Sequence, residues 1–524
     1  MEMPANPHKS NLEKILNLFT EVRSGEGIKA LLLVFNIFLI LTAYYIIKPV
    51  REALILAGGT GELSGAVLKS ITAAGQVFLL MLLIPLYSRI ASQVSRRKLI
   101  NVVTFFFAGC LALFYIIALP QINSVLIEYF QLPTYALGII FFLWVGIFNL
   151  MIPAQFWAFA NDLYTPEAGK RIFVLIAFGA AAGAVLGGVI ANLLIEIVGV
   201  YQLLLVAGVI LLSSLVLTNL AESWDRSRKD GKSVSKEIQQ VEEEPLSKEG
   251  AFRLVFQKKY LLMIAFLMML LNWVNTNGEY ILGQTVENVA KEEAQSAAVQ
   301  QQAEDYAIEQ LKLEQNPLNP SRNSAQDEQT FENKQQESKE ARLEPYRQKY
   351  LKEYVEEYIG NFYAGFFTIV NLVGLLLQLF IVSRVLKYLG IRIAILILPL
   401  ISFIGYVTIA FVPVLLIIRW VKIAENATDY SLQNTVRQVL FLPTSREEKY
   451  KAKQAIDTFF WRAGDVLSAT VVILGSTLLL LKVKHFALLN LVLVSVWFLL
   501  SYFIGKENVK LTSSRKSGEE ASAS

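Results

Sequence analysis

The sequence predicts an all-α polytopic membrane protein with about twelve transmembrane helices in two six-helix halves. Three observations predict this fold class. Hydrophobic residues make up 54% of the 524 residues and charged residues only 18%, whereas a soluble domain is nearer a quarter charged. Several apolar stretches reach the ~20 residues that cross a bilayer as a helix. Lys and Arg gather in alternate connections between these stretches, as in multi-pass proteins.

The predicted spans follow apolar runs, of which the clearest, His485–Ile504, contains no Asp, Glu, Lys or Arg. Their approximate limits are 28–48, 66–90, 99–119, 135–161, 171–196, 201–220, 260–283, 361–384, 391–411, 413–441, 456–481 and 485–504. They divide the chain into an N-terminal segment 1–27, a first half 28–220, a central loop 221–259, a second half 260–504 and a tail 505–524.

The distribution of Lys and Arg predicts that both termini are cytoplasmic. Basic residues gather at 89–98, 170–171, 384–392 and 446–453, whereas the connection 120–133 has none. Short connections rich in Lys and Arg stay on the cytoplasmic side. These four connections, both termini and the central loop are therefore predicted to be cytoplasmic.

A polar insertion, 284–358, interrupts the second half on the predicted outer side. It is rich in Gln, Glu and Lys, and its stretch 332–358 lacks a broad apolar face. This composition predicts solvated helix or partial disorder. A lid over a transport path is an alternative interpretation.

The two halves echo each other in their connections. SRIASQVSRRKLI after the second span resembles SRVLKYLGIRIAI after the eighth, and YTPEAGKRIF resembles LPTSREEKYKAKQAI. Six spans on either side of a central loop are typical of transporters with parallel halves, as in the major facilitator architecture. The alternative is chance similarity between basic loops.

Several classes of chemistry find no support in the sequence. Cys110 is the single cysteine, and His8 and His485 lie far apart, so we expect neither a disulfide framework nor a metal site. The GKS at 231–233 lacks the upstream glycine of a phosphate loop, because Arg226 takes its place. With a net charge of only +4, we expect no nucleic-acid partner. We also expect no enzyme activity and no cofactor.

The end of the first span places two cations together. Lys48 and Arg51 lie three residues apart and therefore share a helix face. Pro49 between them removes a backbone donor and permits a local break. The pair either binds a substrate in the membrane or reaches out to lipid headgroups.

The fourth span ends in aromatic and amide side chains. Phe156, Asn161 and Asp162 belong to the sequence QFWAFANDLY. Aromatic rings with amides can stack on a base and hydrogen-bond its edge. The alternative is an aromatic belt at the interface followed by a helix cap.

Two further spans carry unusual polarity. NWVNTNGEYIL, residues 272–282, holds Glu279 among amides, which predicts a helix broken near Gly278 that lines a cavity. The segment 419–465 carries charges of both signs, which points to transport of a charged solute. In the fifth span, by contrast, small residues every four positions (Gly179, Gly183 and Gly187) predict close helix packing, not binding.

The segment 425–465, ENATDYSLQNTVRQVLFLPTSREEKYKAKQAIDTFFWRAGD, resembles the nucleotide transporter family, the ATP/ADP translocases of intracellular bacteria and plastids. It is similar to that family's YSL…P-x-[KR]-[EQ]…P…K-x-K-x-x-ID…R-x-G pattern. FWAFANDLYTPEAGKRIF and IIKPVREALIL resemble two more of its segments. The polar insertion is not part of the typical family core.

This resemblance implies exchange of nucleotides, ATP for ADP, by two basic and two acidic membrane residues. By motif position these are Arg51, Asp162, Glu279 and Arg437. The family pattern has Lys, Glu and Lys at the first, second and fourth positions, so the sign of each charge is kept. The resemblance also implies a divergent bacterial branch and hence a multi-pass protein of the inner membrane.

We therefore expect a secondary transporter whose partners are a nucleotide and the lipid bilayer, and which acts as a monomer. Lys48, Arg51, Arg437 and Arg462 would donate to phosphate oxygens. Asp162 and Glu279 would balance those cations in the empty state, or bind a base or a proton. Two other hypotheses stay open: a proton-coupled major-facilitator carrier of another small solute, and a non-transporting membrane scaffold that uses the insertion.

Overall fold

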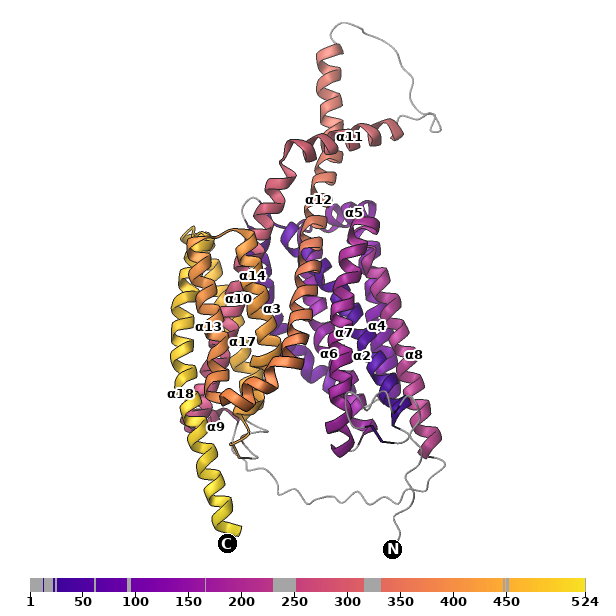
Figure 1. The fold of residues 1–524 in the computed structure, drawn as a ribbon. Helices are drawn as coiled ribbons and strands as arrows, with labels where there is room; N and C mark the ends of the chain where they lie inside the picture. The colour runs from indigo at the N-terminus through magenta and orange to yellow at the C-terminus, as the bar shows by residue number, and fades with distance from the viewer. Residues whose placement is uncertain are drawn as a thin grey trace.

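The structure is a computed structural model. It describes residues 13, 22–23, 26–60, 63–91, 96–164, 166–229, 251–314, 331–445, 448 and 452–523. The helices of the first half are α2 (Gly27–Ala57), α3 (Gly65–Ala91), α4 (Arg96–Ala118), α5 (Pro120–Phe130), α6 (Ala136–Leu163), α7 (Pro166–Val198) and α8 (Leu203–Lys229). They form one bundle that stands beside a second bundle (Figure 1).

The second half mixes α-helices with π-helical segments. Its α-helices are α9 (Ala251–Gln257), α10 (Lys259–Ala294), α11 (Ala297–Glu314), α12 (Phe331–Leu377), α13 (Gly390–Phe411), α14 (Leu415–Thr428), α15 (Asn434–Leu440), α16 (Lys453–Ala455), α17 (Trp461–Ile473) and α18 (Val483–Ala523). The π-helical segments are η1 (Gln378–Val382), η2 (Val385–Leu389), η3 (Asp429–Gln433), η5 (Ile456–Phe460) and η6 (Leu474–Leu478).

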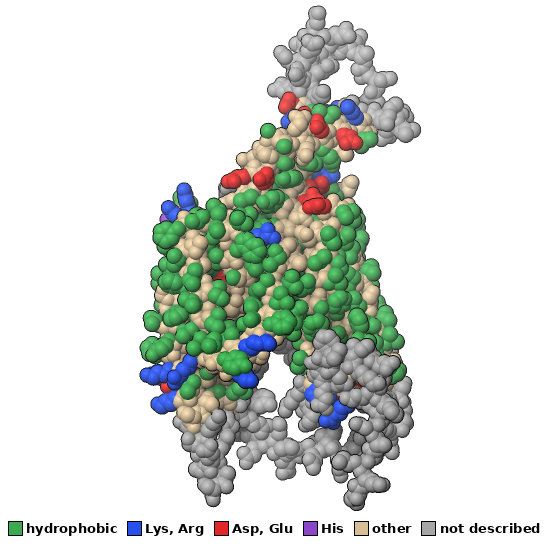
Figure 2. Space-filling model, in the orientation of Figure 1, with side chains coloured by type: hydrophobic (Ala, Val, Ile, Leu, Met, Phe, Trp, Pro, Cys, Tyr) green, Lys and Arg blue, Asp and Glu red, His purple; other side chains and the backbone are tan. Residues whose placement is uncertain are grey.

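Within the described residues, 11 helices are long and apolar enough to cross a membrane. This confirms the all-α polytopic prediction, and green hydrophobic side chains cover the flanks of both bundles (Figure 2). The remaining predicted span, 413–441, is built from α14, η3 and α15, which follow one another without interruption. It is less apolar than the others because it carries charged side chains inside the bundle.

The insertion forms a helical arm beyond the membrane part. α10 and α12 extend well past their predicted spans, and α11 packs across α12 (Figure 1). Ala307, Leu311 and Leu343 form a small apolar cluster in the arm, and Arg347 pairs with Glu304. The sequence suggested solvated helix or disorder because each helix supplies only a few apolar residues. Residues 315–330 of the insertion lie outside the described part.

The glycine stripe of α7 packs directly on α2, as predicted. A Cβ on Gly183 would lie 2.2 Å from the Phe38 carbonyl oxygen, and one on Gly187 would lie 2.4 Å from that of Thr42. The Thr42 hydroxyl donates to the Gly183 carbonyl at 3.2 Å. Only a residue without a side chain allows this backbone approach.

Neither expected helix break is present. α2 continues through Pro49, and α10 continues through Gly278. A Cβ on Gly278 would lie 2.3 Å from the Tyr406 hydroxyl and 2.8 Å from the Lys422 ammonium. The prediction of a broken seventh helix was therefore wrong: glycine here makes room for polar side chains of two other helices.

The two halves meet closely at the end that carries the arm. Ser64 donates to Gln284 at 2.7 Å, the Asn192 amide donates to the Asn361 carbonyl at 3.3 Å, and the Asn361 amide donates to Glu196 at 3.2 Å. At the opposite end, Figure 2 shows the surface hollowed between the halves. α2 begins and α18 ends at that open end (Figure 1).

Candidate substrate site

A chain of ion pairs begins on α2 and crosses into the second half. Arg51 donates from Nε to the Glu52 carboxylate at 3.1 Å, and Lys69 of α3 lies 2.7 Å from the same carboxylate. Lys69 also lies 3.7 Å from Glu279 of α10, so this ion pair joins the halves. We call Arg51, Glu52, Lys69, Glu279, Lys422 and Glu425 the ion chain.

The ion chain continues on α14. Glu279 lies 3.6 Å from the Lys422 ammonium and accepts a hydrogen bond from Asn426 at 3.0 Å. Lys422 is fully buried, lies 2.7 Å from Glu425 and donates to Asn275 at 3.0 Å. Charges of opposite sign thus alternate from one half to the other, which offsets the cost of placing each at membrane depth.

Glu425 is held as a structural carboxylate. Ser402 donates to it at 2.8 Å and Tyr406 at 3.1 Å, in addition to the Lys422 ion pair. With these partners the buried carboxylate is well satisfied. It fixes the position of Lys422.

Glu279 differs from the other carboxylates of the ion chain. Its side chain is 23% exposed, whereas Glu52 and Glu425 are 1% and 3% exposed. Its ion pairs, at 3.6 and 3.7 Å, are also longer than the 2.7 Å pairs that Lys422 and Lys69 make with Glu425 and Glu52. Glu279 is therefore the solvent-accessible and more loosely held anion between two lysines.

Lys48 belongs to the same cluster. Its ammonium lies 3.8 Å from the ring centroid of Phe367 in α12, a favourable cation–π geometry across the two halves. It interacts electrostatically with Arg51 and Glu279. The structure thus brings together three of the predicted site residues: Lys48, Arg51 and Glu279.

Arg437 lies further along the polar face of α14, η3 and α15. Its guanidinium stacks 4.7 Å from the Trp461 ring centroid and lies 3.4 Å from Asp429. Asp429 in turn interacts electrostatically with Lys422. Within the described residues, the buried Nε atom of Arg437 has no hydrogen-bond partner.

Arg462 lies in the first turn of α17. It pairs with Asp465 at 3.3 Å, and Asp465 accepts hydrogen bonds from Asn272 at 2.8 Å and Thr276 at 2.9 Å. Two of the amides and hydroxyls that suggested a broken helix therefore bind a neighbouring helix of the same half.

A family model described as the Major Facilitator Superfamily matches residues 8–285, which is more than half of the chain. The chain belongs to this superfamily. It is accordingly a multi-pass secondary transporter of the major facilitator type. No curated protein sequence matches the chain.

Solved structures of other transporters share the fold. The nucleoside transporter NupG is 11% identical with a TM-score of 0.54, and the match covers 92% of this chain and 99% of NupG. A D-xylose-proton symporter is 13% identical with a TM-score of 0.53, covering 91% and 96%. A bacterial homologue of the iron transporter ferroportin is 13% identical with a TM-score of 0.53, covering 92% and 100%. At these identities the likeness shows the fold alone.

The remaining predicted site residues of the transporter lie on α6. Phe156 is 4% exposed and packs edge-to-face on Trp157 at 5.5 Å. It lines a pocket of about 20 Å³ inside the first half, which has room for about one water. Asn161 is exposed, and the side chain of Asp162 lies outside the described part. Contact of these residues with a base stays a prediction.

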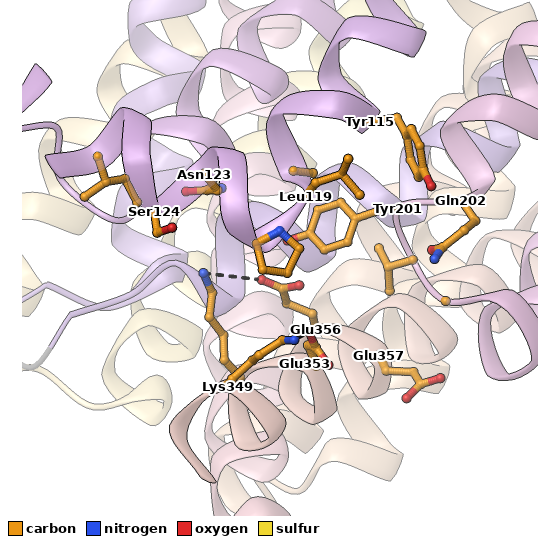
Figure 3. A pocket seen from close by; sticks show the side chains of 16 residues that line it. Tyr115, Leu119, Asn123, Ser124, Tyr201, Gln202, Lys349, Glu353, Glu356 and Glu357 are labelled. Carbon is orange, nitrogen blue, oxygen red and sulfur yellow. Dashed lines mark ion pairs between the residues drawn. The ribbon is translucent and has the colours of Figure 1, made fainter. Parts of the chain in front are cut away.

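A larger pocket of about 430 Å³ lies at the arm end, between α12 and the first half (Figure 3). Tyr201, Gln202 and Glu356 are among its lining residues. The Tyr201 hydroxyl forms a hydrogen bond with Glu356 in this pocket. None of the residues that line this pocket belongs to the ion chain, in which charged groups of the two halves pair with each other.

Sequence reasoning did not single out Glu52 and Lys69 of the ion chain, and it noted Lys422 and Glu425 only as charges of the segment 419–465. Lys69 is a single Lys inside the apolar sequence VLKSITA, and Glu52 directly follows Arg51. A single charge inside an apolar span is the signal that would have found Lys69, because such charges almost always face a partner or a cavity. Within the described residues, no group of His, Cys, Asp or Glu is arranged to hold a metal ion.

Proposed function

We propose that this transporter carries nucleotides, exchanging ATP and ADP, across the bacterial inner membrane by alternating access. The observation that carries the proposal is the excess of cations where the halves meet. Lys48, Arg51, Lys69 and Lys422 surround Glu52, Glu279 and Glu425. A polyanion gains charge-assisted hydrogen bonds from several such donors.

Glu279 is the carboxylate that a phosphate group would replace. It is the exposed anion of the ion chain, and it sits between one lysine of each half. Phosphate oxygens in its place would engage Lys69 and Lys422 while each lysine keeps its tight partner. Since Glu279 bridges the halves in the empty carrier, its displacement by substrate would change the balance between inward-open and outward-open states.

The other predicted residues extend this site. Arg437 offers its unpartnered Nε, Arg462 would join when α17 moves, and Asp162 would balance the cations from α6. Arg51 and Arg437 carry planar guanidinium groups with several donors, whereas the family pattern has lysines, whose ammonium is a compact single charge. The resemblance of 425–465 to the ATP/ADP translocases supports the nucleotide as substrate.

Uptake into proteoliposomes tests the proposal directly. We expect purified protein in liposomes loaded with ADP to take up labelled ATP, and to do so less without internal ADP. Uptake of a sugar or drug driven by a pH gradient, with no nucleotide uptake, would instead support the proton-coupled carrier. Protein that is folded but moves no solute would support the scaffold.

Glu279→Gln and Asp162→Asn should reduce ATP uptake by at least about 10-fold, equivalent to ~1.4 kcal/mol. Glu128→Gln on the exposed surface of α5 is the matched control and should transport normally. Uptake is normalised to folded protein in the membrane. Wild-type rates in both test variants would remove these carboxylates from the mechanism.

We further propose that the arm is external and that the open end of the bundle faces the cytoplasm. Single cysteines at Leu313 of α11 (62% exposed) and Tyr388 of η2 (74% exposed) provide the test in a Cys110→Ala background. A membrane-impermeant maleimide added to intact cells should label position 313 and leave 388 unlabelled. The reverse pattern would invert the topology.

A further inference from the structure

Tyr430 is an exposed aromatic residue inside the bundle. The five residues before it, 425–429, are at most 6% exposed, whereas Tyr430 is 43% exposed. Its hydroxyl lies within electrostatic range of Tyr44 and Tyr45 of α2 and of Glu279 of α10. Since these groups belong to both halves, the exposed ring of Tyr430 faces the space between the halves.

An amide donor lies beside the same space. The Tyr45 ring lies 6.3 Å from the Phe367 ring of α12, and its hydroxyl lies beside Asn371 of the same helix. Asn371 approaches this hydroxyl as a hydrogen-bond donor, but outside ordinary hydrogen-bond geometry, so at least one of the two N–H groups on its buried Nδ2 atom is unsatisfied among the described residues. A buried donor left unsatisfied is costly, so a ligand acceptor at this point would be favoured.

These two features select one kind of chemical group. An exposed aromatic face stacks on another planar ring, and an unpartnered amide N–H binds a ring nitrogen or carbonyl oxygen. The Lys48 ammonium lies 5.2 Å from the Tyr45 ring centroid, and Glu279 is within electrostatic range of Tyr430. A ring bound here could therefore be joined to phosphates at the ion chain.

We propose that Tyr430 and Asn371 form the subsite for the heteroaromatic base of the substrate. This inference rests on the proposed function, because it assigns the second part of the same ligand. The subsite of Tyr430 and Asn371 places the base between the halves. The pocket that Phe156 lines has a volume of only about 20 Å³, which does not hold a base.

Binding to purified full-length protein separates base recognition from phosphate recognition. Calorimetry would compare ATP, adenosine and inorganic tripolyphosphate on the wild type, Tyr430→Phe, Tyr430→Leu and Asn371→Ala. Because Tyr430→Leu removes the ring on which the base stacks, we expect it to weaken ATP binding by about 10-fold, equivalent to ~1.4 kcal/mol. Tyr430→Phe keeps the ring and should stay near the wild type, and Asn371→Ala should weaken ATP and adenosine alike.

Tripolyphosphate affinity should stay the same in all three variants, which also shows that they are folded. Tyr388→Leu, on an exposed tyrosine of η2, is the matched control and should change nothing. Equal ATP affinity in Tyr430→Leu and the wild type would overturn the subsite while the phosphate site stands. A wild type that binds tripolyphosphate as tightly as ATP would also overturn the subsite while the phosphate site stands. A wild type that binds none of the three ligands would overturn the subsite and the proposed function together.

Discussion

The two halves of the transporter accommodate polar groups in different ways. In the first half, α2 to α8 are unbroken α-helices, and the charged members of the ion chain lie on α2 and α3 at the contact with the second half. In the described part of the second half, π-helical segments such as η3 and η5 interrupt the helices, and polar side chains continue into the interior. π-helical turns are common at functional sites.

The packing of helices against one another also differs between the two halves. α7 contacts α2 through glycine and backbone atoms, as at Gly183, which leaves no space for adjustment. In the second half, Asn277 donates to Asn490 at 2.9 Å, and Ser468 donates to Asn277 at 2.6 Å. From the tight α2–α7 contact we infer that the first half is the rigid one, against which the second half moves. The predictions below test that division.

The largest expected loss of stability is that of the variant Lys422→Met in the second half. Lys422 is fully buried, and its removal leaves Glu425 without its cation. Breaking a buried ion pair on one side typically costs about 3–5 kcal/mol. We expect a large fall in thermal stability in detergent, and a much smaller one for Lys387→Met in η2, an exposed lysine. Recovery of stability in the double variant Lys422→Met/Glu425→Gln would show that the unpaired carboxylate is the cause.

The next effect tests the rigid half. Gly183→Leu places a side chain where the Phe38 carbonyl oxygen lies 2.2 Å from the Cβ, so α2 and α7 are forced apart. Overpacking typically costs about 1–3 kcal/mol, and contact with backbone should put this case near 3. Gly109→Leu on α4 is the control, because no atom lies within 4 Å of its Cβ. Equal melting temperatures for the two variants would contradict a rigid α2–α7 contact.

The sequence predicted the fold better than the site. Apolar length and the spacing of Gly179, Gly183 and Gly187 are local signals, and each predicted a feature that the structure has. The cytoplasmic side predicted from the basic connections stays a prediction. The ion chain depends on which helices become neighbours: Lys69 and Glu279 are 210 positions apart in the sequence and carry no shared local pattern. The polar stretch around Gly278 suggested a helix break because the sequence does not show its partners, which lie on α13, α14, α17 and α18.

A smaller effect tests the polar interior of the second half. Ser468→Ala removes the donor that binds the Asn277 side-chain oxygen at 2.6 Å in a fully buried site. The cost of an unsatisfied buried acceptor is about 1–3 kcal/mol, and we expect about 1–2 because Asn277 keeps its bond to Asn490. Ser495→Ala is the control, since that hydroxyl binds only the carbonyl one turn before it on α18. A shift in the control as large as in the test variant would argue against a specific network.

The smallest effect lies at the open end of the second half, where Lys258 pairs with Glu448 at 2.6 Å and the Ser445 amide donates to the same carboxylate at 2.8 Å. Burial alone would raise the pKa of Glu448, but the hydrogen bonds from Lys258 and Ser445 outweigh it and lower the pKa. A lowered folded-state pKa stabilises the protein above the unfolded pKa, and this contribution is lost as the pH falls through the folded value.

We therefore expect Glu448→Gln to be less stable than the wild type at pH 7 by less than about 1 kcal/mol, because Lys258 is 59% exposed and water screens the pair. The difference should shrink once the pH falls below the ordinary carboxyl pKa of about 4.3. Thermal unfolding of both proteins across this range measures it, with Lys258→Met as the second arm of a double-mutant cycle. A difference that stays constant with pH would mean that Glu448 acts through packing and not through its charge.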